Sequence, residues 1–294
     1  MILGIPAVDG HELTQNLLES LAATVSDPAN FEVVIIDNGS IKAYDWSLYR
    51  NFPFHVHIQH YERNIGYYQP LQNLRDFHSK EDLVGLIHND MVIYTYGWDI
   101  LMSQAFLADP KLGLIGLCGS NEIDERGGRG NGTMVNFMGR DMVKFGDKQY
   151  TGQNPSTGRR LPIGKLEPAV CLDSLFMMFK SEAVDKLVRE DEKWSDITLA
   201  HMYDRIWPLR VIEADYGVGV MGIDNDHLGG MTTTANQRYA DDCKFWLMEH
   251  QIPFENPETE MYLEAERRYL GEYRDQKHFI PCSVNEEWTI HHAF

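Results

Sequence analysis

Short apolar runs alternate with amphipathic segments through the first third of the chain, and no other sequence feature constrains the fold as strongly. The predicted strands are residues 2–6, 31–36, 55–60 and 83–87. The predicted helices between them are residues 12–24 and 69–77. Strands separated by helices in this way are typical of a mostly parallel sheet that is covered by helices.

The rest of the chain is less regular. The predicted strands are residues 112–117, 170–179 and 211–222, and the predicted helices are residues 182–189, 239–251 and 258–273. Loops rich in glycine occupy residues 119–133 and 150–164. We predict an α/β catalytic domain at residues 1–235 and a helical extension at residues 236–294, with no internal repeat.

Polar residues follow three of the predicted strands at the point where each strand ends. Asp9 follows the first strand, Asp37 and Asn38 follow the second, and Asn89 and Asp90 follow the fourth. Ligands of such sheets bind beyond the carboxyl ends of the strands. These side chains are therefore predicted to converge on one functional edge.

Composition narrows the class of protein. The formal net charge is −18, with 44 acidic residues against 26 basic ones, which is unlike the basic footprint of a nucleic-acid-binding protein. No apolar stretch is long enough to span a bilayer, and the first residues carry no basic segment of a signal peptide. The four cysteines form no CxxC pair, so we expect reduced thiols in a cytoplasmic protein.

Several ordered motifs go beyond the fold. They are VVIIDNGS at residues 33–40, Asn64-Ile65-Gly66 followed by Asn73, LIHNDM at residues 86–91, DSLFMM at residues 173–178, Tyr203-Asp204-Arg205-Ile206, and His227 followed by Gly229-Gly230. In this order they resemble the inverting GT-A glycosyltransferases of family two, over about residues 2–230. The resemblance implies a GT-A fold and transfer of a sugar from a nucleotide diphosphate donor.

The resemblance also implies roles for individual residues. Asp37 would contact the nucleotide base and Asp9 the ribose or base. The other donor-binding candidates are Pro6, Asn64, Gly66, Asn73 and Asn89.

The metal ligands would be Asp90 and His227, holding Mn²⁺ or Mg²⁺ against the diphosphate. The general base of an inverting reaction would be Asp204, with Asp173 as the second choice or as a residue that orients the acceptor.

Three positions depart from the family pattern. The N-terminal motif keeps Pro6 but has Val8-Asp9 where the family often has Tyr-Asn. His88 stands at the first position of the DxD motif, so Asp90 is its only carboxylate. Tyr203 precedes Asp204 where the family has an acid.

Simpler interpretations exist for most of these residues. Asp37 is in a sequence with strong turn propensity, Asp90 can cap the helix near Trp98, and Asp204 can be a solvated helix residue. Arg126 and Arg129 lie in a glycine-rich segment that we interpret as an active-site lid rather than a nucleic-acid-binding motif. Three tryptophans can either stack on sugars or be buried in the core, and they are Trp194, Trp207 and Trp246.

Three functions are compatible with these motifs. The first is a metal-dependent glycosyltransferase whose acceptor is a glycan, a protein, a small molecule or a modified base in DNA, as for phage enzymes. The second is a non-catalytic GT-A-like protein that binds a nucleotide or glycan. A nucleotidyltransferase is the third, but the acidic loop at residues 7–11 lacks the basic phosphate-binding loop expected of it.

Overall fold

The computed structural model describes residues 1–76, 83–121, 132–139, 143–145, 148–150, 158–187, 203–228, 244, 247–248 and 251–255. The helices are α1 (His11–Thr24), α2 (Tyr68–Asp76), α3 (Trp98–Ala108), α4 (Ser181–Val184) and α5 (Tyr203–Glu213), with 3₁₀ turns η1 (Pro28–Asn30) and η2 (Trp46–Leu48). The strands of the main sheet are β1 (Ile2–Ala7), β2 (Glu32–Asn38), β3 (His55–Tyr61), β4 (Leu83–Ile87), β6 (Leu112–Gly116), β11 (Leu166–Pro168), β13 (Phe176–Lys180) and β14 (Gly217–Met221). The shorter strands are β5 (Met91–Ile93), β7 (Cys118–Ser120), β8 (Thr133–Val135), β9 (Val143–Phe145), β10 (Lys148–Tyr150), β12 (Cys171–Leu172) and β15 (Asn225–His227).

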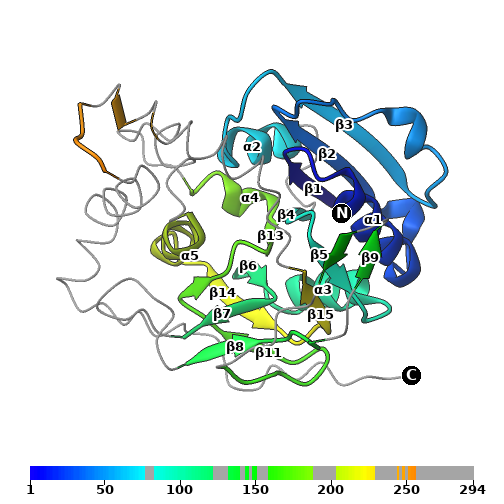
Figure 1. Cartoon of the computed structure of the whole chain (residues 1–294). Helices are drawn as coiled ribbons and strands as arrows, with labels where there is room; N and C mark the ends of the chain where they lie inside the picture. The colour runs from blue at the N-terminus through cyan, green and yellow to red at the C-terminus, as the bar shows by residue number, and fades with distance from the viewer. Residues whose placement is uncertain are drawn as a thin grey trace.

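The main sheet has eight strands in the order β11-β14-β6-β13-β4-β1-β2-β3 (Figure 1). Strands β3, β2, β1 and β4 are parallel, and so are β6 and β14. Strand β13 runs antiparallel between β4 and β6, and β11 is antiparallel at the edge. This is the mostly parallel, helix-flanked sheet that the sequence predicts.

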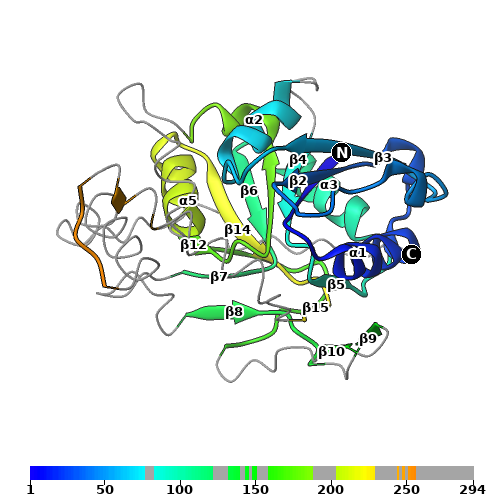
Figure 2. The same cartoon turned by 45° about the horizontal axis from the view of Figure 1, so that its top comes forward.

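Helices cover both faces of this sheet (Figure 2). Successive residues of a strand point to opposite faces, and β2 shows the consequence. Its Val33 and Ile35 join the core that contains α1 and α3, whereas Val34 and Ile36 join the core that contains α2, α4 and α5. Two separate apolar cores therefore hold the sheet, one on each face.

The prediction of a strand at residues 211–222 was wrong over its first half. Val211 belongs to α5 and is fully buried, one turn after the equally buried Trp207. The chain turns at Asp215, which has a φ of 66°, and β14 begins only at Gly217. From Ile212 to Val220 apolar residues alternate with Glu213, Asp215 and two glycines, a period of two that also fits a strand, so the pattern does not mark the boundary.

Other predicted elements differ in their lengths. Residues 170–179 contain two strands, β12 and β13, separated by a turn that carries Asp173. Helix α4 ends at Val184, and the predicted helices at 239–251 and 258–273 lie mostly or wholly outside the described residues. Within the described part of the chain, no helix has the length and apolar character needed to cross a membrane.

The turn after β2 is built around the buried carboxylate of Asp37. Its Oδ1 accepts a hydrogen bond from the Ser40 amide at 3.1 Å, and Oδ2 accepts one from the Tyr44 amide at 3.1 Å. The Nδ1 atom of His60, on neighbouring β3, lies 2.9 Å from the same Oδ2. Although burial raises the pKa of Asp37, the bonds from Ser40, His60 and Tyr44 outweigh it and lower the pKa below 3.8.

We expect Asp37→Ala to lower the free energy of unfolding by about 1–3 kcal/mol, because it leaves buried amide donors without partners. Asp45→Ala is the matched control, since Asp45 also accepts a turn amide bond, from Ser47, but is exposed to water. Urea denaturation of the two variants measures the difference. Equal midpoints would contradict a structural role for the buried carboxylate.

The Asp37 bonds also predict a pH dependence of stability. A carboxyl group whose pKa is lowered in the folded state contributes stability above its unfolded pKa and loses it as the pH falls through the folded pKa. The difference in urea midpoint between the wild type and Asp37→Asn should therefore shrink below about pH 4. A difference that stays constant down to about pH 2.5 would contradict this assignment.

Candidate functional site

The core of the site forms where β4 ends and β5 begins. His88, Asn89 and Asp90 make the connecting turn, and the Met91 amide donates to the His88 carbonyl at 3.3 Å. Strand β5 pairs antiparallel with β15, so that His227 lies opposite Met91. The Leu228 amide also donates to the Asp90 carbonyl at 2.8 Å. This register places residues 88–90 beside a residue more than a hundred positions later in the sequence.

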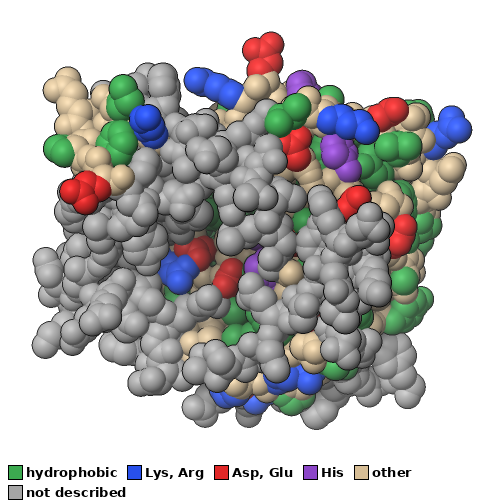
Figure 3. Space-filling model, viewed as in Figure 1, with side chains coloured by type: hydrophobic (Ala, Val, Ile, Leu, Met, Phe, Trp, Pro, Cys, Tyr) green, Lys and Arg blue, Asp and Glu red, His purple; other side chains and the backbone are tan. Residues whose placement is uncertain are grey.

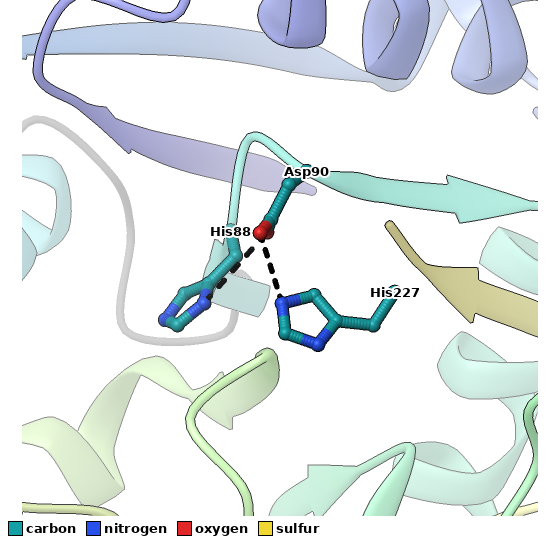
Figure 4. Close-up of side chains that lie close together, drawn as sticks. All are labelled: His88, Asp90 and His227. Atoms are coloured by element: carbon teal, nitrogen blue, oxygen red, sulfur yellow. Dashed lines mark ion pairs between the residues drawn. The ribbon is translucent and has the colours of Figure 1, made fainter. Parts of the chain in front are cut away.

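Alternation along β15 decides which of its side chains faces the turn. The carboxylate of Asp226 accepts bonds from the Tyr94 hydroxyl at 3.1 Å and the Gly139 amide at 2.7 Å. His227, the next residue, points toward Asp90 instead (Figure 4). Asp226 therefore anchors β15 through these two hydrogen bonds, and the imidazole of His227 faces the site.

Three side chains meet here. Asp90 Oδ2 lies 2.9 Å from His227 Nε2, and Asp90 Oδ1 lies 4.0 Å from His88 Nδ1 (Figure 4). One ligand atom from each residue lies within 4.8 Å of the others. In Figure 3, acidic, basic and histidine side chains gather near the centre of the face viewed.

The electrostatics of the three groups are coupled. Burial raises the pKa of Asp90, but the hydrogen bond and positive charge of His227 outweigh it, so the net pKa is lowered. Burial lowers the pKa of His227, but the bond to Asp90 and its charge raise the net pKa. The pKa of His88 is lowered, mainly because the ring is buried. These directions describe a charged Asp90 beside a neutral His88 ring.

This set of residues fits a divalent cation. Within the described residues, Asp90 Oδ1, which lies opposite His88 Nδ1, is buried without a hydrogen-bond partner. A buried polar atom without a partner costs about 1–3 kcal/mol, so such atoms need an explanation. A carboxylate with two imidazoles is a common donor set for divalent metal ions.

Asp173 also lies near this cluster, for a topological reason. Strand β13 is antiparallel to β4, so the residues just before β13 lie at the end of β4, and the His88 amide donates to the Leu175 carbonyl at 2.9 Å. The negative charge of Asp173 contributes to raising the pKa of both His88 and His227. Its Oδ1 accepts the Leu175 amide at 3.3 Å.

Asp204 lies in the first turn of α5. The residue before it, Tyr203, belongs to a stack of aromatic rings that leads to His88. The ring of Tyr203 stacks on Tyr67 with centroids 4.7 Å apart, and Tyr67 stacks toward His88 at 6.3 Å. The Asp204 side chain is buried rather than solvated and forms an ion pair with Arg205. Its second oxygen, Oδ1, is buried without a hydrogen-bond partner in the described residues.

Two predicted donor-binding residues border the cluster. The Asn89 amide group donates to the Gly10 carbonyl at 3.4 Å and to Thr14 Oγ1 at 3.3 Å. Asp9 has a φ of 51°, and its Oδ1 accepts the Ile41 amide at 2.8 Å. The loops after β1, β2 and β4 are thus tied together at one edge of the sheet, as the sequence predicts.

The remaining donor-binding candidates are held by the fold itself. Asn64 Oδ1 accepts bonds from the Asn38 side chain at 2.8 Å and the Gly66 amide at 2.9 Å. Asn73 donates from α2 to the Tyr61 hydroxyl at 2.8 Å, and Pro6 lies within β1. These contacts stabilise the loop between β3 and α2, and the donor-binding roles stay predictions. The same holds for Asp37, whose side chain is fully buried.

Several predicted residues fall outside the described part of the chain: Arg126, Arg129, Trp194, Gly229, Gly230 and Trp246. Trp207 is described, and it is fully buried against Phe179 and Tyr203. Core packing is therefore its role. Asp90 does not cap α3, because Gly97 occupies the N-cap position.

The sequence interpretation missed His88 as a member of the cluster. It counted the histidine as the loss of a DxD carboxylate. The available signal was the spacing His88-x-Asp90 directly after a buried strand, since imidazole is itself a metal ligand.

A scan against protein-family models found no match, and a search of curated proteins found none either. Among solved structures, the chain is similar to residues 1–349 of S. aureus TarS, with 15% identity, a TM-score of 0.47, and coverage of 90% of this chain and 71% of that one. The same protein in complex with UDP-GlcNAc matches at 14% identity and a TM-score of 0.47, over 94% of this chain and 75% of that one. The mannosyltransferase PcManGT from Pyrobaculum calidifontis, in complex with GDP-Man and Mn²⁺, matches at 13% and 0.47, over 90% and 68%. These are similarities of fold, and they assign no residue and no ligand to this chain.

We expect Asp90→Ala to abolish the Mn²⁺-dependent part of nucleotide diphosphate binding, because it removes the only carboxylate of the cluster. Isothermal titration with UDP and GDP, with Mn²⁺ or with EDTA, measures that part. The exposed Asp45→Ala variant is the control and should bind as the wild type does. Unchanged binding by Asp90→Ala would remove Asp90 from the site.

Proposed function

We propose that the chain is a metal-dependent glycosyltransferase whose catalytic domain, residues 1–235, transfers a sugar from a nucleotide diphosphate donor to an acceptor hydroxyl with inversion. One observation carries the proposal: the partly buried cluster of His88, Asp90 and His227 at the carboxyl edge of a mostly parallel sheet. The motif order along the chain supports the same reaction. The acceptor is a glycan, a protein, a small molecule or a modified base in DNA.

The cluster supports the donor half of the reaction. His88, Asp90 and His227 would hold a divalent cation, which when bound stabilises the negative charge that develops on a departing diphosphate. Asn89 and Asp9 border this position and would contact the nucleotide. The half-buried Tyr67 and the buried Tyr203 stack on each other beside His88 and would cover this side of the cluster.

The acceptor half needs a general base, and we propose Asp204. The ion pair with Arg205 fixes its carboxylate, while Oδ1 is left without a hydrogen-bond partner in the described residues. An acceptor hydroxyl that donates to Oδ1 would satisfy this oxygen and transfer its proton to it as the oxygen attacks the anomeric carbon. Asp173 would orient the acceptor from the end of β4.

The experiment that tests the function is a donor screen. The purified chain is incubated with a panel of UDP-, GDP-, dTDP- and CMP-linked sugars and Mn²⁺, and release of the nucleotide is measured. We expect hydrolysis or thermal stabilisation with one class of donor and neither in EDTA. Full activity in excess EDTA would contradict metal dependence, and no response to any donor would contradict glycosyl transfer.

Once a donor and an acceptor are known, Asp204→Asn should lower kcat by about 10²–10⁴-fold, because a positioned base contributes about this much. The variant keeps the size of the side chain, and donor binding should be retained. Thermal unfolding must be measured beside it, since Arg205 loses its charged partner. Asp173→Asn is the matched variant and should act mainly on the acceptor KM.

NMR of the product tests the stereochemistry. We expect the anomeric configuration of the donor to be inverted, and a retained configuration would contradict the mechanism. A near-normal kcat for folded Asp204→Asn, together with a collapse for Asp173→Asn, would assign the base to Asp173 instead.

A further inference from the structure

The cluster at the end of β4 differs in composition from a site made of carboxylates alone. Of its three members, two are imidazoles, His88 and His227, and only Asp90 supplies oxygen. In the glycosyltransferase family that the sequence resembles, the first acid of the DxD motif occupies the position of His88. The histidine therefore changes the chemistry of the site.

We propose that His88, Asp90 and His227 form a preorganised two-histidine, one-carboxylate site that binds a transition-metal dication without nucleotide and discriminates against Mg²⁺. His88 is the residue that determines this selectivity. The inference rests on the proposed function for the use of the ion, but its test needs neither a donor nor an acceptor.

The gap between His88 and Asp90 supports direct ligation by both residues. His88 Nδ1 and Asp90 Oδ1 are 4.0 Å apart, too far for a hydrogen bond. Two ligands on opposite sides of one ion, each with a bond of about 2.1 Å, would be about 4.2 Å apart. Asp90 Oδ1 is buried and has no hydrogen-bond partner in the described residues, so an ion between the two atoms would satisfy it.

The backbone holds the three ligands before any ion binds. The His88 amide is bonded to the Leu175 carbonyl of the segment before β13, and the Leu228 amide is bonded to the Asp90 carbonyl. His227 is fixed opposite Met91 by the pairing of β15 with β5. Because the ligands come from the short β4–β5 turn and from the end of β15, which these backbone bonds hold together, little conformational entropy is lost on binding. An ion should therefore bind without the additional oxygens of a diphosphate.

The donor atoms decide which ion is preferred. Mg²⁺ favours oxygen ligands in octahedral geometry and gives up its water reluctantly. Imidazole favours later first-row metals, whose affinities for such sites rise from Mn²⁺ through Fe²⁺ and Co²⁺. A site with two nitrogens and one carboxylate is therefore a poor Mg²⁺ site and a good site for these ions.

The first experiment is metal binding to the full chain without nucleotide. Isothermal titration and electron paramagnetic resonance of free Mn²⁺ give the Mn²⁺ affinity, and competition gives the affinity for Mg²⁺. We expect Mn²⁺ to bind at least about tenfold more tightly than Mg²⁺. In His88→Asp this ratio should fall by about tenfold or more, since even outer-sphere partners are worth about 10–100-fold in metal affinity. Equal affinities in the wild type, an unchanged ratio in His88→Asp, or no binding of Mn²⁺ would overturn the inference.

His57→Ala is the matched control. His57 is an exposed histidine of β3 whose Nε2 lies 3.7 Å from Glu32, and it should leave the ratio unchanged. Circular dichroism and thermal unfolding confirm that His88→Asp and His57→Ala are folded. A loss of selectivity in His57→Ala would point to non-specific binding by surface histidines and overturn the assignment.

Spectroscopy of bound Mn²⁺ tests the ligands themselves. Electron spin echo modulation from ¹⁴N should show two imidazole nitrogens in the wild type and one in His88→Asp. A single nitrogen in the wild type would overturn ligation by His88. Two nitrogens together with failure of every sugar donor would instead contradict only the proposed function, so the two failures are distinguishable.

Discussion

The site depends on the burial of one strand. Every residue of β4 is buried, and the strand lies between β1, which is parallel to it, and β13, which is antiparallel. Gly85 permits this close packing, because a Cβ there would lie 2.8 Å from the Met177 carbonyl oxygen of β13. A strand with no polar residue cannot supply chemistry along its length, so its chemistry begins at the first residue beyond it, His88.

The antiparallel direction of strand β13 also determines which residues reach the site. In a wholly parallel sheet, the residues that precede a strand lie at the opposite edge from those that follow its neighbour. Because β13 is antiparallel to β4, the turn with Asp173 precedes it and yet lies beside His88. This edge of the sheet therefore carries residues that follow β4 and residues that precede β13. The pairing of β15 with β5 adds His227 to them.

The accuracy with which the sequence predicts a strand depends on the length of the apolar pattern in that strand. Strands such as β1, β2 and β4 were predicted within two residues because their apolar runs are continuous and end in polar residues. The predicted start of β14 was wrong, since an alternation of apolar and polar residues continues across the end of α5. The three residues of β15, Asn225–His227, carry no apolar pattern at all, and only pairing with β5 defines them. The place of His227 beside Asp90 came from motif order, and periodicity contains no information on it.

The carboxylates differ in whether the fold satisfies their buried oxygens, and this difference separates structural residues from candidate site residues. Asp37 accepts bonds at both oxygens, and Asp99 likewise receives the Ser26 and Asp27 amides. These groups are satisfied by the fold, and burial then costs little. Asp90 and Asp204 each bury one oxygen without a partner in the described residues. Since an unsatisfied buried polar group destabilises a protein by about 1–3 kcal/mol, two such oxygens indicate stability given up for ligands that complete them.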